Sequence, residues 1–470
     1  MAAGSSSTAD EATLAESLVE RCLDVTVDNL TDDAYDRAHV LFRDALGVIL
    51  GSAMATESSE IVQDMVSVVY GDGEATVAGG GSAPVPAAAF ANGTIFHGIE
   101  LDDTHSGASV HPGAVVIPAV LAVGEAKGAT GSEALEAMVA GYECMVRIGR
   151  AANPAALYER GFHPTACCGV FGSALAAAKL RGLSEAETVD AVGIAGSFAG
   201  GNQEYLAEGV LSKRIQPGHA ARSGIIATEL ASRGYTGPRT ILEGDNGFFA
   251  AYSDDSDPDA LLATIDDDSS FEVTRTGIKP HACCRYNQTP IDAVLDLTEE
   301  HDVSVSDIDS ITVEIVDAAM SIVAIPHDRK TRPKSSTAAQ FSLQYSVAVA
   351  LIERRAFLEQ FREPHLSDPD VHDLIDRITV EHGEDLESYY PDFFPARATV
   401  RTTSGEEYSI LLKTCRGEPA NPLSEAELRE KYDLLAERYL DTEDAAALEA
   451  LATDLPSVAD VGEITAYFRG

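Results

Sequence analysis

Three segments of this chain combine helical periodicity with a high density of alanine and glycine. Apolar residues recur every three or four positions along them, which is the pattern of a helix with a buried face. Small side chains on such faces let neighbouring helices approach closely. The pattern therefore predicts a large packed helical domain, and the segments that carry it are 131–152, 167–182 and 184–201.

An acidic connection near residues 254–270 separates this helical part from a middle segment of different character. Beyond it, apolar and polar residues alternate with the period of two that β-strands have, between helical stretches. From residue 417 the chain returns to an amphipathic helical pattern, which we expect to pack on the first helical part. The predicted fold is thus mainly α with a smaller α+β domain. The predicted limits are 1–268 and 413–470 for the two parts of a large all-helical domain and 269–412 for the inserted α+β domain.

Within the middle segment, individual elements follow from the periodicity. The alternating runs predict strands over 270–279, 307–317, 386–393 and 394–412. Helical spacing predicts helices over 289–301, 335–355 and 368–381.

The charge of the chain is extreme, because 76 acidic residues outnumber 33 Lys and Arg and leave a net charge of −43. Such a surface repels other anions, so neither nucleic acid nor an anionic membrane is expected as a partner. The acids are spread along the chain and do not form a tail. This distribution is typical of adaptation to high internal salt, which screens the repulsion, and we expect a halophilic protein.

Seven cysteines include two adjacent pairs, Cys167–Cys168 and Cys283–Cys284, and no CxxC motif. An odd number with adjacent pairs does not favour a disulfide framework, and a reducing cytoplasm fits. The first twenty residues lack the basic and apolar regions of a secretory signal. Apolar runs such as Ala114–Ala126 contain proline and are too short to span a bilayer. We therefore expect a cytoplasmic protein that does not enter a membrane.

The densest group of ionisable side chains lies between residues 97 and 111. Histidine titrates near neutrality, and carboxylates beside it change its pKa and its orientation. Three histidines and three acids within fifteen residues are a candidate catalytic group, although a polar helix end with its loop has a similar composition. The members of the group are His97, Glu100, Asp102, Asp103, His105 and His111.

Two short islands of positive charge stand out against the acidic background. One contains Lys213 and Arg214, and the other contains Lys279 and Arg285. A desolvated carboxylate needs a Lys or Arg partner, so the islands indicate an anionic ligand, whereas a solvated basic patch is the simpler alternative. His163 lies before a proline at a turn into a small-residue helix, where an ordinary loop histidine is the other reading.

The sequence does not favour a metal or a phosphate site. The cysteine pairs lack the spacing of structural zinc sites and of iron–sulfur clusters. The acids and histidines between residues 97 and 111 lack the i, i+4 pairing of HExxH, which makes a metal site there the less favoured alternative. The glycines at 79–81 have neither Walker nor GxGxxG spacing. We therefore expect no metal and no cofactor.

Taken together, the motifs resemble those of the MmgE/PrpD family over nearly the whole chain. That family includes 2-methylcitrate dehydratase, cis-aconitate decarboxylase and an iminodisuccinate epimerase. The resemblance implies a large helical domain built from both chain ends, an inserted α+β lid domain and a homodimer. The matching segments occur in order at 92–125, 161–165, 212–224, 237–248, 278–293, 336–351 and 417–432.

The resemblance also implies where the active-site cleft lies. Many members have Asp where this chain has Glu100, and many have His where it has Gln288. Some dehydratases of the family carry Gln-Thr, as Gln288–Thr289 does here, which favours dehydration. Tyr286 and Tyr345 are candidates for an active-site tyrosine. The residues carried over from the family are Glu100, Asp102, Asp103, Thr104, His111, His163, Lys213 and Lys279.

These residues predict acid–base chemistry on a di- or tricarboxylate. His111 and His163 are expected to act as general acid and base, with Asp102 or Asp103 orienting a histidine. The substrate carboxylates and the charge that develops beside them are expected to be held by Lys213, Lys279 and Arg285, with Glu100 and Thr104 also at the substrate.

We expect a cofactor-independent lyase of the 2-methylcitrate dehydratase type, which removes water from a citrate-like tricarboxylate in a pathway such as propionate catabolism. Decarboxylation of cis-aconitate and epimerisation of a dicarboxylate remain open alternatives. A further alternative is a carboxylate-binding paralogue that has lost its chemistry.

Overall fold

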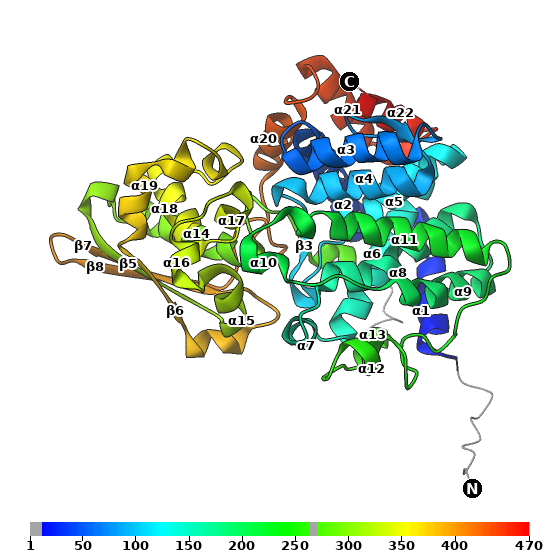
Figure 1. Ribbon diagram of the computed structural model, residues 1–470, viewed down its shortest axis with the longest axis horizontal. Coiled ribbons are helices and arrows are strands. Elements are labelled where there is room, and N and C mark those ends of the chain that lie inside the picture. The colour runs from blue at the N-terminus through cyan, green and yellow to red at the C-terminus, as the bar shows by residue number, and fades with distance from the viewer. Residues whose placement is uncertain (1–11, 264–269, 470) are drawn as a thin grey trace, which may run out of the picture.

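The computed structural model describes residues 12–263 and 270–469. It has a larger helical lobe and a smaller lobe with a sheet (Figure 1), which confirms the predicted mainly α fold with a smaller α+β domain. The predicted boundary at 268–269 lies outside the described residues. The helices of the first part of the chain are α1 Leu14–Leu23, α2 Asp32–Ala53, α3 Glu57–Tyr70, α4 Val85–Phe96, α5 Gly113–Lys127, α6 Gly131–Ala151, α7 Pro154–Glu159, α8 Pro164–Arg181, α9 Glu185–Ala195, α10 Tyr205–Glu208, α11 Ile215–Ala231, α12 Phe248–Tyr252 and α13 Asp259–Leu262.

The alanine- and glycine-rich segments form the centre of the helical lobe. α8 packs between α6 and α11, and α4 and α5 complete the layer. Nearly every side chain of α8 is buried on all sides, because small residues allow the neighbouring helices to enclose it. Two short antiparallel strand pairs accompany these helices. One is a hairpin of β1 (Ala75–Val77) and β2 (Gly81–Ala83), and the other joins two distant segments, β3 (Thr104–His105) and β4 (Thr276–Gly277).

The C-terminal helices return to the helical lobe. α20 (Glu425–Ala436) packs against α2, and α21 (Thr442–Thr453) and α22 (Gly462–Thr465) follow beside it. The packing is tightened by a buried ion pair, in which Lys431 of α20 lies 2.7 Å from Asp44 of α2. The helical lobe is therefore built from both ends of the chain, as predicted.

The smaller lobe contains a four-stranded sheet in the order β6–β5–β7–β8, parallel only between β5 and β6. The inward-facing residues of β5 and β7 alternate with exposed ones, as expected of a sheet with one covered face. The elements of this lobe are β5 Ile308–Ile315, β6 Ile378–His382, β7 Ala396–Thr402, β8 Glu407–Leu412, α14 Arg285–Glu300, α15 Asp317–Ala319, α16 His327–Lys330, α17 Ser336–Gln340, α18 Leu343–Glu353 and α19 Pro369–Ile375.

Several predicted elements of the middle segment differ from the structure. The helix expected over 368–381 ends at Ile375, because the β-branched run that follows pairs with β5 as strand β6. The helix expected over 335–355 is two helices, since the Ser342 hydroxyl accepts from the Tyr345 amide and caps α18. The residues expected to form a strand over 386–393 belong instead to the 3₁₀ turn Glu384–Tyr389 and to the turn that follows it.

The strand expected over 270–279 is reduced to β4. The residues before it form the 3₁₀ turn Glu272–Arg275, because Glu272 is held by the helical lobe through both its backbone and its side chain. Its amide donates to the Glu143 carboxylate, and its own carboxylate lies 2.6 Å from Arg150.

No single described helix combines the length and the apolar character of a membrane span. Only α2 and α3 taken together pass that test by length and composition, and they are bent by 85° at the break between them.

Candidate active site

The site begins where the chain leaves α4. A 3₁₀ turn over His97–Ile99 ends at Glu100, whose φ of 58° is in the left-handed region that disfavours residues with a side chain. The Glu100 carboxylate contacts Lys213 and Arg214 and lies 3.3 Å from the Lys279 ammonium. Three buried cations around one carboxylate hold this strained conformation in place.

Lys213 and Arg214 reach Glu100 because α11, which follows them, crosses α4 at very short range. The crossing point is Gly218, where a Cβ atom would lie 2.2 Å from the carbonyl oxygen of Phe90. Only glycine allows this approach, and it places the residues before α11 beside the end of α4.

Lys279 lies far from Glu100 in the sequence, and the pairing of β3 with β4 brings it to the site. Thr104 pairs with Gly277, and two residues later the Lys279 ammonium lies 3.4 Å from Asp102. The ammonium is therefore shared between the Asp102 and Glu100 carboxylates. Although burial opposes it, this position raises the pKa of Lys279.

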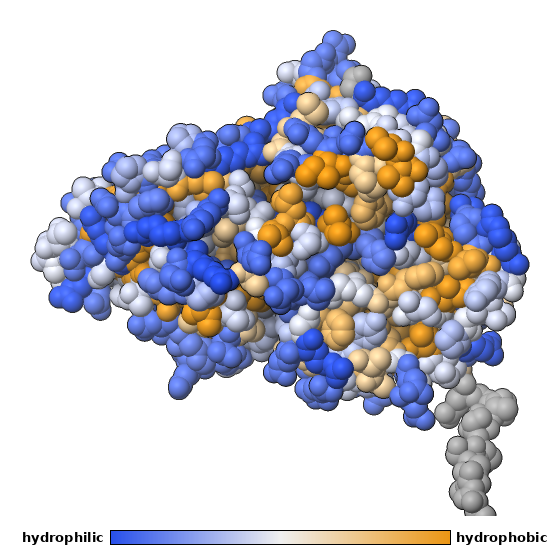
Figure 2. Space-filling view, viewed as in Figure 1, coloured by the Kyte–Doolittle hydropathy of each residue, from blue (hydrophilic) through white to orange (hydrophobic). Residues whose placement is uncertain are grey.

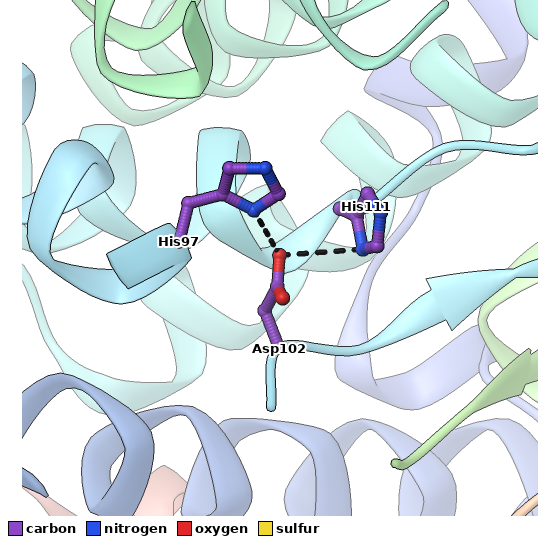
Figure 3. A group of neighbouring side chains, drawn as sticks. All are labelled: His97, Asp102 and His111. Atoms are coloured by element: carbon purple, nitrogen blue, oxygen red, sulfur yellow. Dashed lines mark hydrogen bonds and ion pairs between the residues drawn. The ribbon is translucent and has the colours of Figure 1, made fainter. Parts of the chain in front are cut away.

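Asp102 joins two histidines (Figure 3). Its Oδ2 lies 2.5 Å from Nδ1 of His97 and 3.3 Å from Nδ1 of His111. Nδ1 of His111 also lies 2.9 Å from the carbonyl oxygen of Asp103. Since these partners only accept, the proton of each ring belongs on Nδ1, and Nε2 keeps its lone pair.

His163 also carries its proton on Nδ1, but a different partner holds it there. It precedes α8, and its Nδ1 lies 2.7 Å from the amide oxygen of Gln216. The amide nitrogen of Gln216 donates to the Asn202 carbonyl, which fixes that oxygen toward the histidine. The proton of His163 therefore belongs on Nδ1, and Nε2 is available as a base.

All three histidines are neutral at neutral pH. Burial lowers the pKa of His97 to about 4 despite the neighbouring Asp102. Burial, with Lys213 adding to it, lowers the pKa of His163 to about 3. Burial also holds the pKa of His111 well below its usual range. Nε2 of His97 is buried and has no hydrogen-bond partner among the described residues.

For Glu100, Asp102 and Lys213, neighbouring charges oppose the effect of burial on the pKa. Burial alone would raise the pKa values of Glu100 and Asp102, but the surrounding cations and histidines hold both well below their usual range. Lys213 shares Glu100 with Arg214, so burial is only partly offset and its pKa falls to about 8. Lys213 therefore still carries a proton at pH 7 and loses it in mildly alkaline solution.

Asp103 has a different role from Asp102. Its carboxylate accepts from the Tyr142 hydroxyl at 2.6 Å and from the Gly113 amide at 2.9 Å, at the start of α5. Burial raises its pKa to about 7. Of the two acids predicted to orient a histidine, Asp102 contacts the histidines with its side chain, and Asp103 reaches His111 only through its carbonyl.

A small cavity of about 40 Å³ lies between the two lobes. Six of the nine predicted site residues line it, whereas Asp102, Asp103 and Lys279 lie behind its wall. The cavity is lined by Glu100, Thr104, Ser109, His111, Tyr158, His163, Gln203, Tyr205, Leu206, Lys213, Cys284, Arg285, Tyr286, Ile322, Phe341 and Phe394.

Two tyrosines of the wall, Tyr158 and Tyr205, had no signal in the sequence that would single them out. Tyr286 lines the cavity as well, but Tyr345 does not, because its hydroxyl donates to the Gln360 carbonyl elsewhere. Gln288 is also absent from the wall. Its side-chain amide bonds to the backbone of residues 281–284 and stabilises the loop before α14.

Two other predicted residues are occupied by structural partners. His105 lies 3.2 Å from Glu272, away from the cavity. Arg285 lines the cavity but pairs with Glu418 at 2.5 Å. A substrate carboxylate would therefore compete with Glu418 for this guanidinium.

Within residues 12–263 and 270–469, His97, Asp102 and His111 offer ligand atoms that lie within 4.8 Å of one another, and a metal ion could use such a group of donors. The Lys279 ammonium lies 3.4 Å from the same Asp102 carboxylate. A positive charge so close opposes a cation at this position. The arrangement fits a hydrogen-bonded histidine pair better than a metal centre.

Two family models match the chain in succession. The MmgE/PrpD N-terminal domain matches residues 16–261, and the MmgE/PrpD C-terminal domain matches residues 281–456. A cis-aconitate decarboxylase-like protein of Aspergillus oryzae is 31% identical over 82% of both chains. The cis-aconitate decarboxylase of Aspergillus terreus is 30% identical over 93% of this chain and 92% of its own. The human cis-aconitate decarboxylase is 27% identical over 97% and 95%, respectively.

Proposed function

The chain belongs to the MmgE/PrpD family, and on that premise we propose that it is a lyase that decarboxylates cis-aconitate or a closely related unsaturated tricarboxylate. The relatives of about 30% identity that carry the name cis-aconitate decarboxylase match 93% and 94% of the chain. They favour decarboxylation over the dehydration expected from Gln288, whose side chain does not line the cavity.

One observation carries the proposal. The cavity between the lobes is lined by a protonated lysine, Lys213, and by two neutral histidines, His111 and His163. A bound tricarboxylate would place its negative charges beside these groups. Lys213 binds a carboxylate of the substrate, and Lys279 behind the wall adds to the positive potential.

Binding of the substrate also supplies the acid. Burial is the main reason that the pKa values of His111 and His163 are low, and Lys213 lowers them further. The negative charge of the substrate raises these pKa values, so one of the two histidines can take up a proton as the substrate enters. Decarboxylation then breaks one carbon–carbon bond and releases CO₂. The remaining electron pair takes up one proton, which the histidine or Lys213 delivers. Asp102 keeps His111 oriented throughout and stabilises its charged form.

Dehydration of a citrate-like acid is the second candidate. It is favoured by the free Nε2 atoms of His111 and His163, since this reaction needs one base for the carbon-bound proton and one acid for the departing hydroxyl. The two reactions differ in whether carbon is lost, and in whether the substrate already contains a double bond.

The test is direct. Purified protein is incubated with cis-aconitate, citrate and 2-methylcitrate, and the products are followed by NMR. We expect CO₂ and a five-carbon dicarboxylate from cis-aconitate. Loss of water from citrate or 2-methylcitrate would instead establish dehydration. Absence of turnover together with thermal stabilisation by one of the acids would indicate a carboxylate-binding paralogue. Activity that disappears on exhaustive chelation would contradict the cofactor-independent mechanism.

The surface supports a homodimer as the working form. Large apolar side chains are exposed on α3, with 76% of Val68 and 64% of Val69 accessible. Val210, Leu211 and Ile215 are exposed beside the start of α11. Figure 2 shows apolar side chains gathered over these elements. A second copy would cover this face. Light scattering of the wild type and of Val69→Glu tests this: a dimer and a monomer are expected, respectively.

A further inference from the structure

The cavity at the candidate site is too small for the substrate that we propose. Its volume of about 40 Å³ is far below the roughly 300–1,000 Å³ of sites that hold small organic ligands. A tricarboxylate therefore enters only after part of the wall has moved. Which part moves, and from which side the acid arrives, can be derived from the neighbouring surface.

A second pocket of about 460 Å³ adjoins the cavity, and we call it the outer pocket. It shares three wall residues with the cavity, Tyr205, Leu206 and Phe341. These side chains are the partition between the two spaces. Tyr205 and Phe341 have their ring centroids 6.4 Å apart, and Tyr205 also contacts the ring of His163.

The outer pocket is basic in a chain that is strongly acidic. Its charged residues are four cations, Arg329, Lys330, Arg332 and Lys334, and two acids, Glu208 and Asp328. This reverses the ratio of the whole chain, which has 76 acids and 33 bases. Such a pocket attracts anions where the rest of the surface repels them.

The two sides of the partition differ in how firmly they are held. On the α+β side, the buried Lys330 ammonium donates to the carbonyls of Phe341 and Ile322 at 2.8 Å and 2.6 Å. Both of these residues line the cavity, so Lys330 fixes that wall. On the helical side, Tyr205 and Leu206 belong to α10, a helix of only four residues.

α10 is flanked by glycines in conformations that a side chain would disfavour. Gly201 has a φ of 137°, and Gly209 has a φ of 68°. Gly209 lets the backbone turn directly after α10, whereas residues 201–203 before it are bonded to residues 161–163 and form the fixed end of the segment. α10 is therefore the part of the partition that is built to move.

The basic segment also fastens α10. The Arg329 guanidinium donates to the Ala207 carbonyl, and the Ser335 hydroxyl donates to the Gly209 carbonyl at 3.4 Å. Figure 1 shows α10 beside α16 and α17, at the boundary of the lobes. A carboxylate binds a guanidinium more strongly than a neutral carbonyl does. An arriving acid can therefore take Arg329 away from α10.

We propose that the outer pocket is a docking site for the carboxylate substrate and that α10 is the gate between it and the inner cavity. The inference rests on the proposed function for the identity of the acid. Arg329 and Lys334 receive a carboxylate, α10 loses its bond to Arg329 and swings aside, and the acid passes to Lys213. α10 then closes and excludes water from the reaction.

A blocking experiment tests the docking site. All seven native cysteines are buried, so a polymer maleimide labels only a cysteine introduced at the surface. Lys334→Cys places the label at the outer pocket, and Lys127→Cys places it at the end of α5. Labelling is expected to lower kcat/KM for cis-aconitate about tenfold or more in the Lys334→Cys protein. It is expected to change kcat/KM less than about twofold in the Lys127→Cys protein.

An unchanged kcat/KM in labelled Lys334→Cys protein would overturn the docking site and leave the proposed function intact. If the unlabelled wild type neither turns over nor binds any of the three acids, the proposed function itself fails.

Hydrogen exchange tests the gate by a measurement that does not depend on enzyme activity. Arg329→Met removes the bond to α10, whereas Arg332→Met removes an arginine of the same segment that pairs with Asp376. The amides of Gly209 and Val210, which bond to the Tyr205 carbonyl, are expected to exchange about tenfold faster in Arg329→Met than in Arg332→Met. Equal exchange in the two variants would overturn the gate.

Discussion

Two groups of cations lie on opposite sides of the α10 partition. The inner cations, Lys213, Arg214 and Lys279, are at most 3% exposed and share the carboxylates of Glu100 and Asp102. The outer cations are Arg329, Arg332 and Lys334, which line an open pocket beside solvent.

The difference between them separates two uses of the same charge. A buried cation interacts with its neighbours through a medium of low dielectric constant, where salt has little access. An exposed cation acts through water, and about 1 M salt reduces the range of its field to about 3 Å. The inner cations therefore determine binding and chemistry, and the outer ones determine how fast an anion arrives.

The largest effect is expected from an inner cation. Lys213→Met removes the lysine that lines the cavity but leaves Glu100 paired with Arg214 and Lys279, so the fold is kept. We expect kcat/KM to fall about 10²–10³-fold, by the same factor at low and high KCl. Lys127→Met, an exposed lysine on α5, is the control. A loss smaller than tenfold, or one that depends on salt, would count against the assignment of Lys213.

The second prediction concerns Asp103, a buried carboxyl group that pairs with no cation among the described residues. Its pKa is raised, whereas the pKa values of Glu100 and Asp102 are lowered. The pKa of Asp103 rises from 3.8 to about 7, so folded protein retains a proton that the unfolded chain loses, and stability falls as pH rises through that window. Asp103→Asn carries no ionisable group at this position.

The free energy of unfolding of Asp103→Asn, relative to that of the wild type, should therefore rise by a few kcal/mol as the pH increases from about 4 to about 7. Denaturant unfolding of both proteins at several pH values measures the gain. A constant difference between them across this range would refute the raised pKa.

The next effect concerns the ionisation of Lys213. Burial lowers its pKa to about 8, so the lysine is charged below that pH and loses its charge above it. We expect kcat/KM of the wild type to decrease about tenfold per pH unit above pH 8. A pH–rate profile that stays flat to pH 10 would show that the charge of Lys213 is not required.

The smallest effect is expected from an outer cation. Lys334→Glu reverses a charge at the outer pocket and should lower kcat/KM about three- to tenfold at low salt. In about 2 M KCl the difference from the wild type should vanish. Lys413→Glu makes the same change just after the end of β8, away from the pocket, and controls for net charge. Equal losses in both variants would remove the distinction between inner and outer cations.

Much of the fold could be predicted from the chain, because periodicity reflects burial on one face. The helical lobe and strand β5 follow from it, and the single run expected over 394–412 contains β7 and β8, which a turn separates. The errors in the smaller lobe arose where a tertiary contact outweighed local preference. β6 is a strand because β5 is available to pair with it, and residues 272–275 turn because Glu272 is bonded to the helical lobe.

The candidate site was predictable as a set of residue types. The sequence alone identified His111, His163, Lys213 and Arg285, which line the cavity. It could not separate Asp102 from Asp103, since adjacent residues have the same composition around them. Only the packing shows that one bridges two histidines and the other holds Tyr142. The salt requirement expected from the net charge of −43 remains a prediction.

By itself, the sequence determined that this chain forms a large helical domain, a smaller α+β domain and a group of acids, bases and cations suited to a carboxylate. Periodicity and residue chemistry are local properties, and they can be read from the sequence. The tertiary structure alone decided which of these groups meet, on which ring nitrogen His97, His111 and His163 carry their protons, and that a helix of four residues separates the inner cations from the outer ones. Those properties depend on distances between residues far apart in the chain, which only packing determines.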